Sequence, residues 1–204
     1  MLDNEQLQAA ASTMAGLRPI PVAVTTTDGT RSNGLISLSG GPASIVPEAP
    51  RAMVGITKYN FTHDLIASGG VFVIHVLGND DDLIDSSIEI IKALGGRSGR
   101  DGDKLAGLRV GTGATGAPIL LDALSYVECR VTGSYDNDEN TTYFGDVVAA
   151  ARLHRGGKLD IGTAWSRLGS AWTAQYELDH EPQISHSRSM RGLPPTPTTE
   201  EVHP

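Results

Sequence analysis

The sequence contains very little cysteine, and this shortage limits the kind of protein it can encode. Its 204 residues include one cysteine, Cys129, so the chain cannot form an intramolecular disulfide. Cys129 lies in an apolar, strand-like run, and no histidine or second cysteine is near it in the sequence to activate the thiol. We therefore expect an inert, packed thiol rather than a reactive one.

Long apolar runs and targeting segments are also missing. Nowhere are roughly 18 consecutive residues apolar, so we expect no membrane-spanning helix. Residues 1–15 carry Asp3 and Glu5 and lack the basic start of a signal peptide. We therefore expect a cytoplasmic protein that does not insert into membranes.

Basic residues are outnumbered, with 16 Lys and Arg against 24 Asp and Glu, which gives a formal net charge of −8. Such a chain repels a polyphosphate backbone, and no cluster of Lys or Arg offsets the repulsion. Nucleic acids and anionic membranes are therefore not expected partners.

Familiar catalytic and metal-binding motifs are absent from the sequence. The six histidines show none of the spacings typical of a metal site, and there is neither a GxSxG nucleophile elbow nor a phosphate-binding P-loop. The sequence offers no obvious nucleophile or other certain catalytic residue. Any chemistry would then come from a cofactor, which the protein would bind, orient and tune.

One motif, Gly111-Thr112-Gly113-Ala114-Thr115-Gly116, spells the dinucleotide-binding pattern GxGxxG. That pattern works only where a helix follows, because the helix N-terminus binds the pyrophosphate. Here Pro118 and the strand-like run Ile119-Leu120-Leu121 follow instead. We therefore interpret the motif as a flexible Gly/Thr loop and not as a Rossmann site.

Glycine and proline are abundant by contrast, with 24 and 11 residues against 5% aromatics. This balance indicates many turns between short strands, as in a β-barrel or sandwich, and the length suits one main domain. The sequence pattern divides the chain into an N-terminal helix (1–15), a barrel domain (16–180) and a Pro/Ser/Thr-rich tail (181–204), whose last twenty residues we expect to be mobile.

Local patterns predict at least six strands and three or four short helices within this frame. The predicted strands are Val22–Thr27, Ser32–Ser39, Arg51–Thr57, Val71–Leu77, Ile119–Thr132 and Thr141–Leu153. The predicted helices are Asn4–Ala15, a short one capped by Thr62, Asp80–Leu94 and Ile161–Tyr176, and Gly40–Pro50 is expected to be a loop at the barrel mouth.

A series of short motifs follows one order along residues 16–155. The motifs are Pro21–Thr26, Asn33–Ile36, Val46–Pro50, Thr62–Leu65, Phe72–Leu77, Asp103–Gly107, Gly116–Leu120, Glu128-Cys129 and Phe144–Val147. Each is weak alone, but their shared order and spacing are specific. The series resembles the flavin reductase-like, FMN-binding family, and the resemblance implies a mainly β split barrel with short helices that works as a homodimer.

The resemblance also implies a flavin site made of two segments. The flavin ring and ribityl chain would lie along Ile36, Ser37, Leu38 and Ser39, and the FMN phosphate would contact Thr57, Lys58, Tyr59, Asn60 and Thr62. The chemistry is suitable, because an irregular Ser/Gly backbone can approach a flat ring and a lysine beside a helix start can bind an anion. Without the resemblance, the same residues read as strand hydroxyls, a solvated lysine and a helix cap.

The sequence departs from the family pattern at several positions. Where this sequence has His75, the family usually has Asn. Where it has Asp138-Glu139-Asn140, the family often has Gly-Asp-His. The family also often carries other residues at the positions of Leu38 and Gly40. Since the histidine of that tripeptide lies near the pyridine nucleotide in the family, His75 and Asn140 are expected on the nicotinamide or substrate side. His75, on an apolar strand, could instead be a satisfied core or interface histidine.

The function implied by the resemblance is an NAD(P)H-dependent flavin reductase. It would use NADH or NADPH to reduce FMN, or FAD, and would supply the reduced flavin to a partner monooxygenase. One alternative is an FMN-binding oxidoreductase or electron carrier that retains its flavin. Another is a non-catalytic split barrel that serves as an interaction module.

Overall fold

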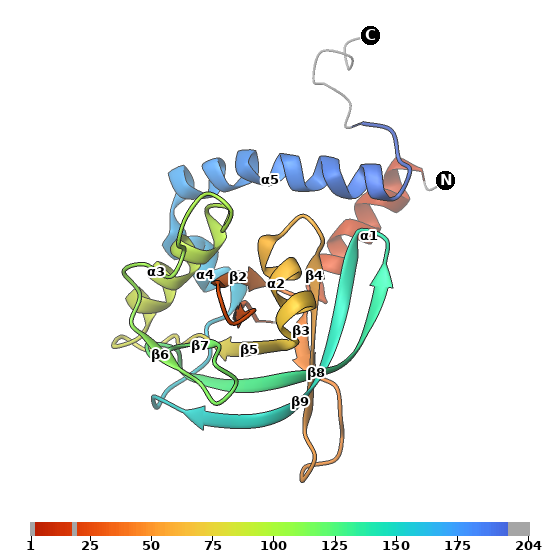
Figure 1. Ribbon diagram of the computed structural model, residues 1–204. Coiled ribbons are helices and arrows are strands. Elements are labelled where there is room, and N and C mark those ends of the chain that lie inside the picture. The colour runs from red at the N-terminus through yellow and green to blue at the C-terminus, as the bar shows by residue number, and fades with distance from the viewer. Residues whose placement is uncertain (1–2, 18–19, 196–204) are drawn as a thin grey trace.

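The computed structural model of the protein describes residues 3–17 and 20–195 (Figure 1). In chain order the elements are α1 Asn4–Gly16, β1 Val22–Thr27, β2 Ser32–Ser37, β3 Gly40–Pro42, β4 Arg51–Thr57, α2 Phe61–Gly69, β5 Val71–Val76, α3 Ile84–Gly95, β6 Val110–Thr112, β7 Pro118–Leu120, β8 Ser125–Asn137, β9 Asn140–Arg152, α4 Ile161–Leu168 and α5 Ser170–Met190.

Seven strands form one antiparallel sheet in the order β2-β1-β5-β8-β9-β4-β3, and β6 and β7 form a separate two-stranded ribbon. Figure 1 shows the sheet curling into a half-barrel, with the long β8–β9 hairpin sweeping up one side. The predicted fold class, mainly β with short helices in a split-barrel arrangement, is confirmed.

Two apolar clusters cover the two faces of the sheet, as the period of two in a strand requires. Along β1, Val22 and Val24 pack into a cluster with Phe72 and Cys129, whereas Ala23 between them packs toward α3 and α4. Cys129 is fully buried, and burial raises the pKa of its thiol to about 12. The expectation of an inert packed thiol is therefore confirmed.

Several helices and strands begin or end at other residues than predicted, each for a local reason. The strand predicted over Ile119–Thr132 is broken at residues 121–124, where Ala123 donates its N–H to Leu120 in a turn. Residues 40–42, expected within a loop, pair with β4 as the edge strand β3, a position where Pro42 costs the sheet little. The predicted helix from Asp80 begins at Ile84, because the Asp80 carbonyl accepts from Leu83 and Ile84 in a preceding turn.

The C-terminal region differs most from the prediction. The helix predicted over Ile161–Tyr176 is divided at Gly169, whose φ of 81° no helix can continue through. The second helix, α5, then runs through Pro182 to Met190, so residues 181–190 are helical although we assigned them to the tail. Residues 196–204 lie outside the described residues.

In the part of the chain that the structure describes, the helices are too short or too polar to cross a membrane.

Candidate functional site

The last residue of β4 and the loop that leads to α2 carry four of the residues expected to hold a phosphate. Thr57 ends β4 and pairs in register with Asn140, the first residue of β9. Two residues earlier, on the same face of β4, Gly55 donates its N–H to the Ser39 carbonyl at 2.9 Å. The fold therefore brings together residues from the two predicted flavin segments and Asn140, which are far apart in the sequence.

The N-terminus of α2 is positioned to bind an anion. Asn60 is the N-cap residue, but its side chain makes no capping bond within the described residues and reaches Thr57 Oγ1 instead. The N–H groups of Phe61 and Thr62 likewise have no partner among residues 3–17 and 20–195. Free N–H groups at the positive end of a helix are the usual components of a phosphate site.

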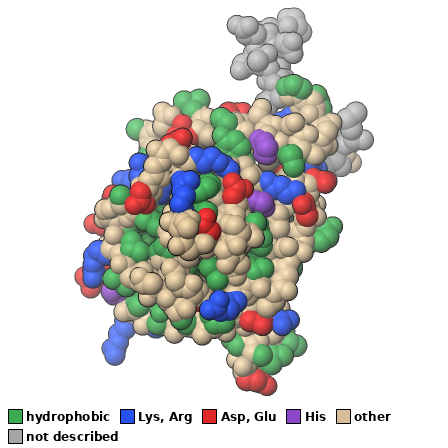
Figure 2. All heavy atoms as spheres, in the orientation of Figure 1, with side chains coloured by type: hydrophobic (Ala, Val, Ile, Leu, Met, Phe, Trp, Pro, Cys, Tyr) green, Lys and Arg blue, Asp and Glu red, His purple; other side chains and the backbone are tan. Residues whose placement is uncertain are grey.

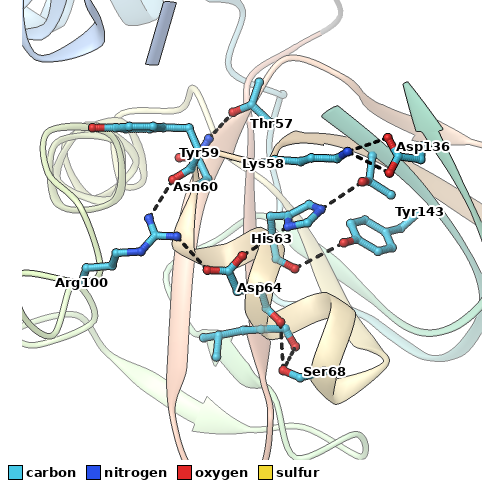
Figure 3. A network of polar contacts seen from close by, with 12 residues as sticks. Thr57, Lys58, Tyr59, Asn60, His63, Asp64, Ser68, Arg100, Asp136 and Tyr143 are labelled. Carbon is cyan, nitrogen blue, oxygen red and sulfur yellow. Dashed lines mark hydrogen bonds and ion pairs between the residues drawn. The ribbon is translucent and has the colours of Figure 1, made fainter. Parts of the chain in front are cut away.

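Lys58 lies beside this helix start and is held by Asp136 on β8 (Figure 3). Its Nζ is 2.6 Å and 2.8 Å from the two carboxylate oxygens, and this bond lowers the pKa of Asp136. The backbone N–H of Lys58 also donates to the Glu139 carbonyl at 3.0 Å. Because an ammonium group has three donors, Lys58 is oriented and still has capacity for a further acceptor.

Arg100 is a neighbour of the loop that the sequence analysis did not select. Its guanidinium donates to the Tyr59 carbonyl and to Asp64, each at 2.7 Å, and lies over the Phe61 ring at 5.5 Å (Figure 3). Arg100 lies three residues before the motif Asp103–Gly107 that resembled the family, and this proximity was the signal available for finding it. It fixes the backbone of the loop from the side opposite Lys58.

The Thr62 hydroxyl does not cap helix α2, although the sequence suggested this role. It is 1% exposed, and its Oγ1 accepts from Asn33 Nδ2 at 2.9 Å in the interior. The prediction that Thr62 caps the helix is therefore wrong, since Asn60 occupies that position. Only the backbone N–H of Thr62 faces the helix start.

The segment Ile36–Ser39 is divided between interior and surface. The Ser37 hydroxyl is buried and accepts the Ser39 N–H at 3.0 Å, and Ile36 packs against the α3 cluster. Leu38 is half-buried, whereas Ser39 is exposed and its hydroxyl has no partner within the described part of the chain. Ser39 and the backbone around it are thus available to a ligand, and Ser37 supports their conformation.

His75 lies apart from this loop, in the middle of β5. It is fully buried, with Nδ1 3.2 Å from the Ala23 carbonyl and Nε2 accepting the Leu120 N–H at 3.0 Å. Burial lowers its pKa to about 4, so the ring is neutral at pH 7 and Nδ1 carries the proton. This geometry supports the alternative of a satisfied core histidine.

Helix α5 crosses above the β4–α2 loop, which sequence reasoning did not anticipate (Figure 1). Gln183 donates to Thr57 Oγ1 at 2.8 Å, and the His186 ring lies 5.6 Å from that of Tyr59. The first half of α5 reaches the other segment, because Trp172 packs with Ile36 against the α3 cluster. The helix therefore spans both predicted flavin segments.

Acidic and basic side chains both lie on the face of the molecule that carries the site. Figure 2 shows acidic, basic and histidine side chains intermixed over the upper part of this face. Within residues 3–17 and 20–195, no three His, Cys, Asp or Glu side chains are grouped to hold a metal ion. A phosphate here would be recognised by the specific donors of the loop rather than by a broad positive potential.

Comparisons with known proteins find relatives of this sequence. The chain is 33% identical over 134 residues to the high molecular weight rubredoxin of Moorella thermoacetica, covering 65% of this chain and 56% of that protein. It is 27% identical over 123 residues to the ferric-chelate reductase (NAD(P)H) of Archaeoglobus fulgidus, covering 60% of this chain and 66% of that protein. The matches thus span between about half and two thirds of these relatives.

A solved structure supports the fold. The FMN-binding protein from Thermus thermophilus superposes with a TM-score of 0.58 at 23% identity, covering 67% of this chain and 71% of that one. The sequence model of the family described as "Flavin reductase like domain" matches residues 15–162, which include every strand of the sheet. The chain therefore belongs to the flavin reductase-like family.

Proposed function

We propose that the protein is an NAD(P)H-dependent flavin reductase that binds its flavin at the β4–α2 loop. The observation that carries the proposal is the position of Lys58 just before the uncapped N-terminus of α2, in a loop that the fold brings near Asn140 and Ser39. Membership of the family and the relative named as an NAD(P)H-dependent reductase support the same reaction class.

The donors at the loop fit the phosphate end of a flavin. The Phe61 and Thr62 N–H groups and the Lys58 ammonium supply both directed hydrogen bonds and positive charge. Thr57, Tyr59 and Asn60 complete the loop, and Arg100 holds its backbone through the Tyr59 carbonyl. These groups suit a phosphate monoester better than an uncharged ligand.

The ring end is proposed to lie along Ile36, Ser37, Leu38 and Ser39. Ser39 and the nearby backbone would bond the polar edge of the ring, while Leu38 would contact its apolar face. Asn140, which pairs with Thr57, is proposed to face the nicotinamide. His75 is left out of the proposed site, because both of its ring nitrogens are bonded in the core.

A bound flavin would supply the redox chemistry, by accepting two electrons from NADH or NADPH and passing them to a second acceptor. The chain itself would bind and orient the reactants, since no side chain at the loop is required to act as a strong acid or base. Positioning of this kind can lower a barrier by roughly 7–11 kcal/mol in the best cases. Substitutions at the loop should therefore act through flavin affinity and geometry.

The physiological role is proposed to be supply of reduced FMN or FAD to a partner monooxygenase in the cytoplasm. A homodimer is proposed as the working form, in keeping with the resemblance. Apolar side chains that remain exposed on the two outer helices fit such an assembly, namely Leu7 and Met14 of α1 and Leu178 and Ile184 of α5.

A second candidate is an FMN-binding electron carrier that retains its flavin. The bond between Gln183 and Thr57 favours it, because α5 lies across the phosphate loop and would slow the release of a bound flavin. Flavin that stays with the protein through gel filtration would favour the carrier, and flavin that is lost would favour the reductase.

Binding titrations with FMN and riboflavin test the proposed site, because riboflavin lacks the phosphate. Lys58→Gln should weaken FMN binding by about tenfold or more, the usual value of a charge-assisted hydrogen bond, and should leave riboflavin unchanged. Lys92→Gln, on α3, removes the same charge elsewhere and serves as the control. Unchanged FMN affinity, or an equal loss for both ligands, would contradict a phosphate site at this loop.

A further inference from the structure

A cavity of about 320 Å³ lies between α5 and the turn that joins β8 to β9. Thr57, which belongs to the proposed phosphate loop, forms part of its wall, and Glu139, His180, Gln183, Arg188 and Arg191 are among the other lining residues. The volume is at the lower end of the range for small-molecule sites. A ligand at the loop could extend into this cavity without crossing the sheet.

The cavity has an excess of positive charge. Arg191 Nη1 is 3.6 Å from Glu139 Oε1, and Arg188 Nε donates to the Pro194 carbonyl at 2.7 Å. Each guanidinium has five N–H donors, so most of them remain available to an oxyanion. His180 adds no charge at neutral pH, because burial lowers its pKa. Two cations therefore face one carboxylate.

One flat ring, that of His180, lines the same cavity. It stacks on the Tyr176 ring at 5.3 Å with an interplanar angle of 26°. The His186 ring, six residues further along α5, lies 5.6 Å from the Tyr59 ring of the phosphate loop. Imidazole and phenol rings are common stacking partners for a purine base. The cavity thus combines donors for a phosphate with one ring, that of His180, on which a base can stack.

We propose that this cavity binds the adenosine diphosphate group of a dinucleotide, and specifically that of FAD. The proposal rests on the proposed flavin site, because it begins from a phosphate held at Thr57–Asn60. FMN ends at that phosphate, whereas FAD continues into a second phosphate and an adenosine. The second phosphate would meet Arg188 and Arg191, and the adenine would lie against the His180 ring. Helix α5 would therefore make the protein prefer FAD to FMN.

Titration of a double variant, Arg188→Gln with Arg191→Gln, tests this assignment. The affinity for FAD should fall by at least about tenfold, while the affinities for FMN and riboflavin should stay unchanged. The control is Arg155→Gln with Arg167→Gln, which removes the same charge from exposed positions outside the cavity. The thermal unfolding midpoint of each variant checks that the fold is intact.

Three results would overturn the proposal. Unchanged FAD affinity would show that the cavity does not contact FAD, and equal losses for FAD and FMN would place the arginines at the shared phosphate. A higher KM for NADH or NADPH with unchanged FAD affinity would assign the cavity to the pyridine nucleotide. If the unmodified protein bound neither FMN nor FAD, the proposed flavin site itself would fail, which is a distinct outcome.

Removal of the opposing acid gives a complementary test. Glu139→Gln frees Arg191 and removes a negative charge facing the cavity, while the backbone bond from Lys58 to residue 139 is retained. FAD should bind several-fold more tightly and FMN should be unaffected. Weaker or unchanged FAD binding in this variant would contradict the role given to Arg191.

Discussion

His75 is a buried ionisable group whose two ring nitrogens are both bonded to the backbone. Its folded pKa of about 4 lies below the ordinary value of 6.5, so the folded protein favours the neutral ring. The unfolded chain takes up this proton first as the pH falls, and the folded state therefore loses stability between about pH 6.5 and pH 4. Above that window the contribution of His75 is complete.

We predict that acidification across this window lowers the free energy of unfolding by on the order of 3 kcal/mol through His75, at 1.36 kcal/mol per pKa unit. His75→Asn should flatten this part of the pH profile, because an amide does not titrate. Urea unfolding at a series of pH values measures the effect. An unchanged slope in the variant would assign the pH dependence to other groups.

At the residue scale, the sequence allowed candidate residues to be selected where they lie between predicted elements. It could not show contacts between residues that are far apart in the chain. Thr57, Lys58 and Asn60 could be selected because they lie between a predicted strand and a predicted helix. The burial of Thr62 depends on Asn33, which is 29 positions away, and no local pattern shows that contact. Arg100 was missed for the same reason, since its bond to the Tyr59 carbonyl joins residues separated by 41 positions.

At the scale of elements, α2 is held in place by a close approach at its C-terminus. A Cβ added at Gly69 would lie 2.0 Å from the Thr27 carbonyl oxygen of β1, which backbone cannot avoid by a rotamer change. The position of α2 matters because its N-terminus forms the proposed phosphate site.

Gly69→Ala is expected to destabilise the protein by about 1–3 kcal/mol, as other overpacked sites do, and to weaken FMN binding by shifting α2. Gly41→Ala is the matched control, because its added Cβ would meet open space. Thermal unfolding and FMN titration report the two effects. Equal stability in the two variants would mean that the contact relaxes without cost.

The GxGxxG segment provides a second element-scale example. As expected, no helix follows it, since Gly111 lies in β6 and Pro118 begins β7. The loop between them is fixed by the buried carboxylate of Glu128, which accepts the N–H groups of Ala114 and Thr115 at 3.1 Å and 2.9 Å. The glycines thus serve a tight loop over Glu128, which the sequence motif alone does not reveal.

Glu128→Gln should destabilise the protein by about 1–3 kcal/mol, because one carboxylate oxygen becomes an amide donor facing another donor. Glu89→Gln, on the exposed side of α3, controls for the loss of charge. Urea unfolding midpoints compare the two variants. If they were equally stable, the Glu128 contacts would not be needed to hold the loop.

For the whole molecule, local sequence patterns predicted most strands of the sheet, and the split-barrel arrangement followed from the resemblance to the family. It did not predict the path of α5, since Pro182 reads as a helix breaker and the contacts of Gln183 and His186 that support the helix are remote in sequence. The same helix carries exposed apolar side chains that fit a dimer interface.

We predict that light scattering will give a solution mass twice that of one chain. Leu178→Glu on α5, where the side chain is 66% exposed, should shift the protein toward the monomer if this helix takes part in the interface. A monomeric unmodified protein would contradict the proposed homodimer.

The central claim is that the protein passes electrons from NADH or NADPH to a bound flavin. Anaerobic stopped-flow absorbance tests it most directly, with protein and FMN or FAD mixed separately with each nucleotide. The account predicts rapid bleaching of the visible flavin band by at least one nucleotide, much faster than with free flavin. If flavin bound but neither nucleotide reduced it faster than free flavin, the reductase assignment would be contradicted.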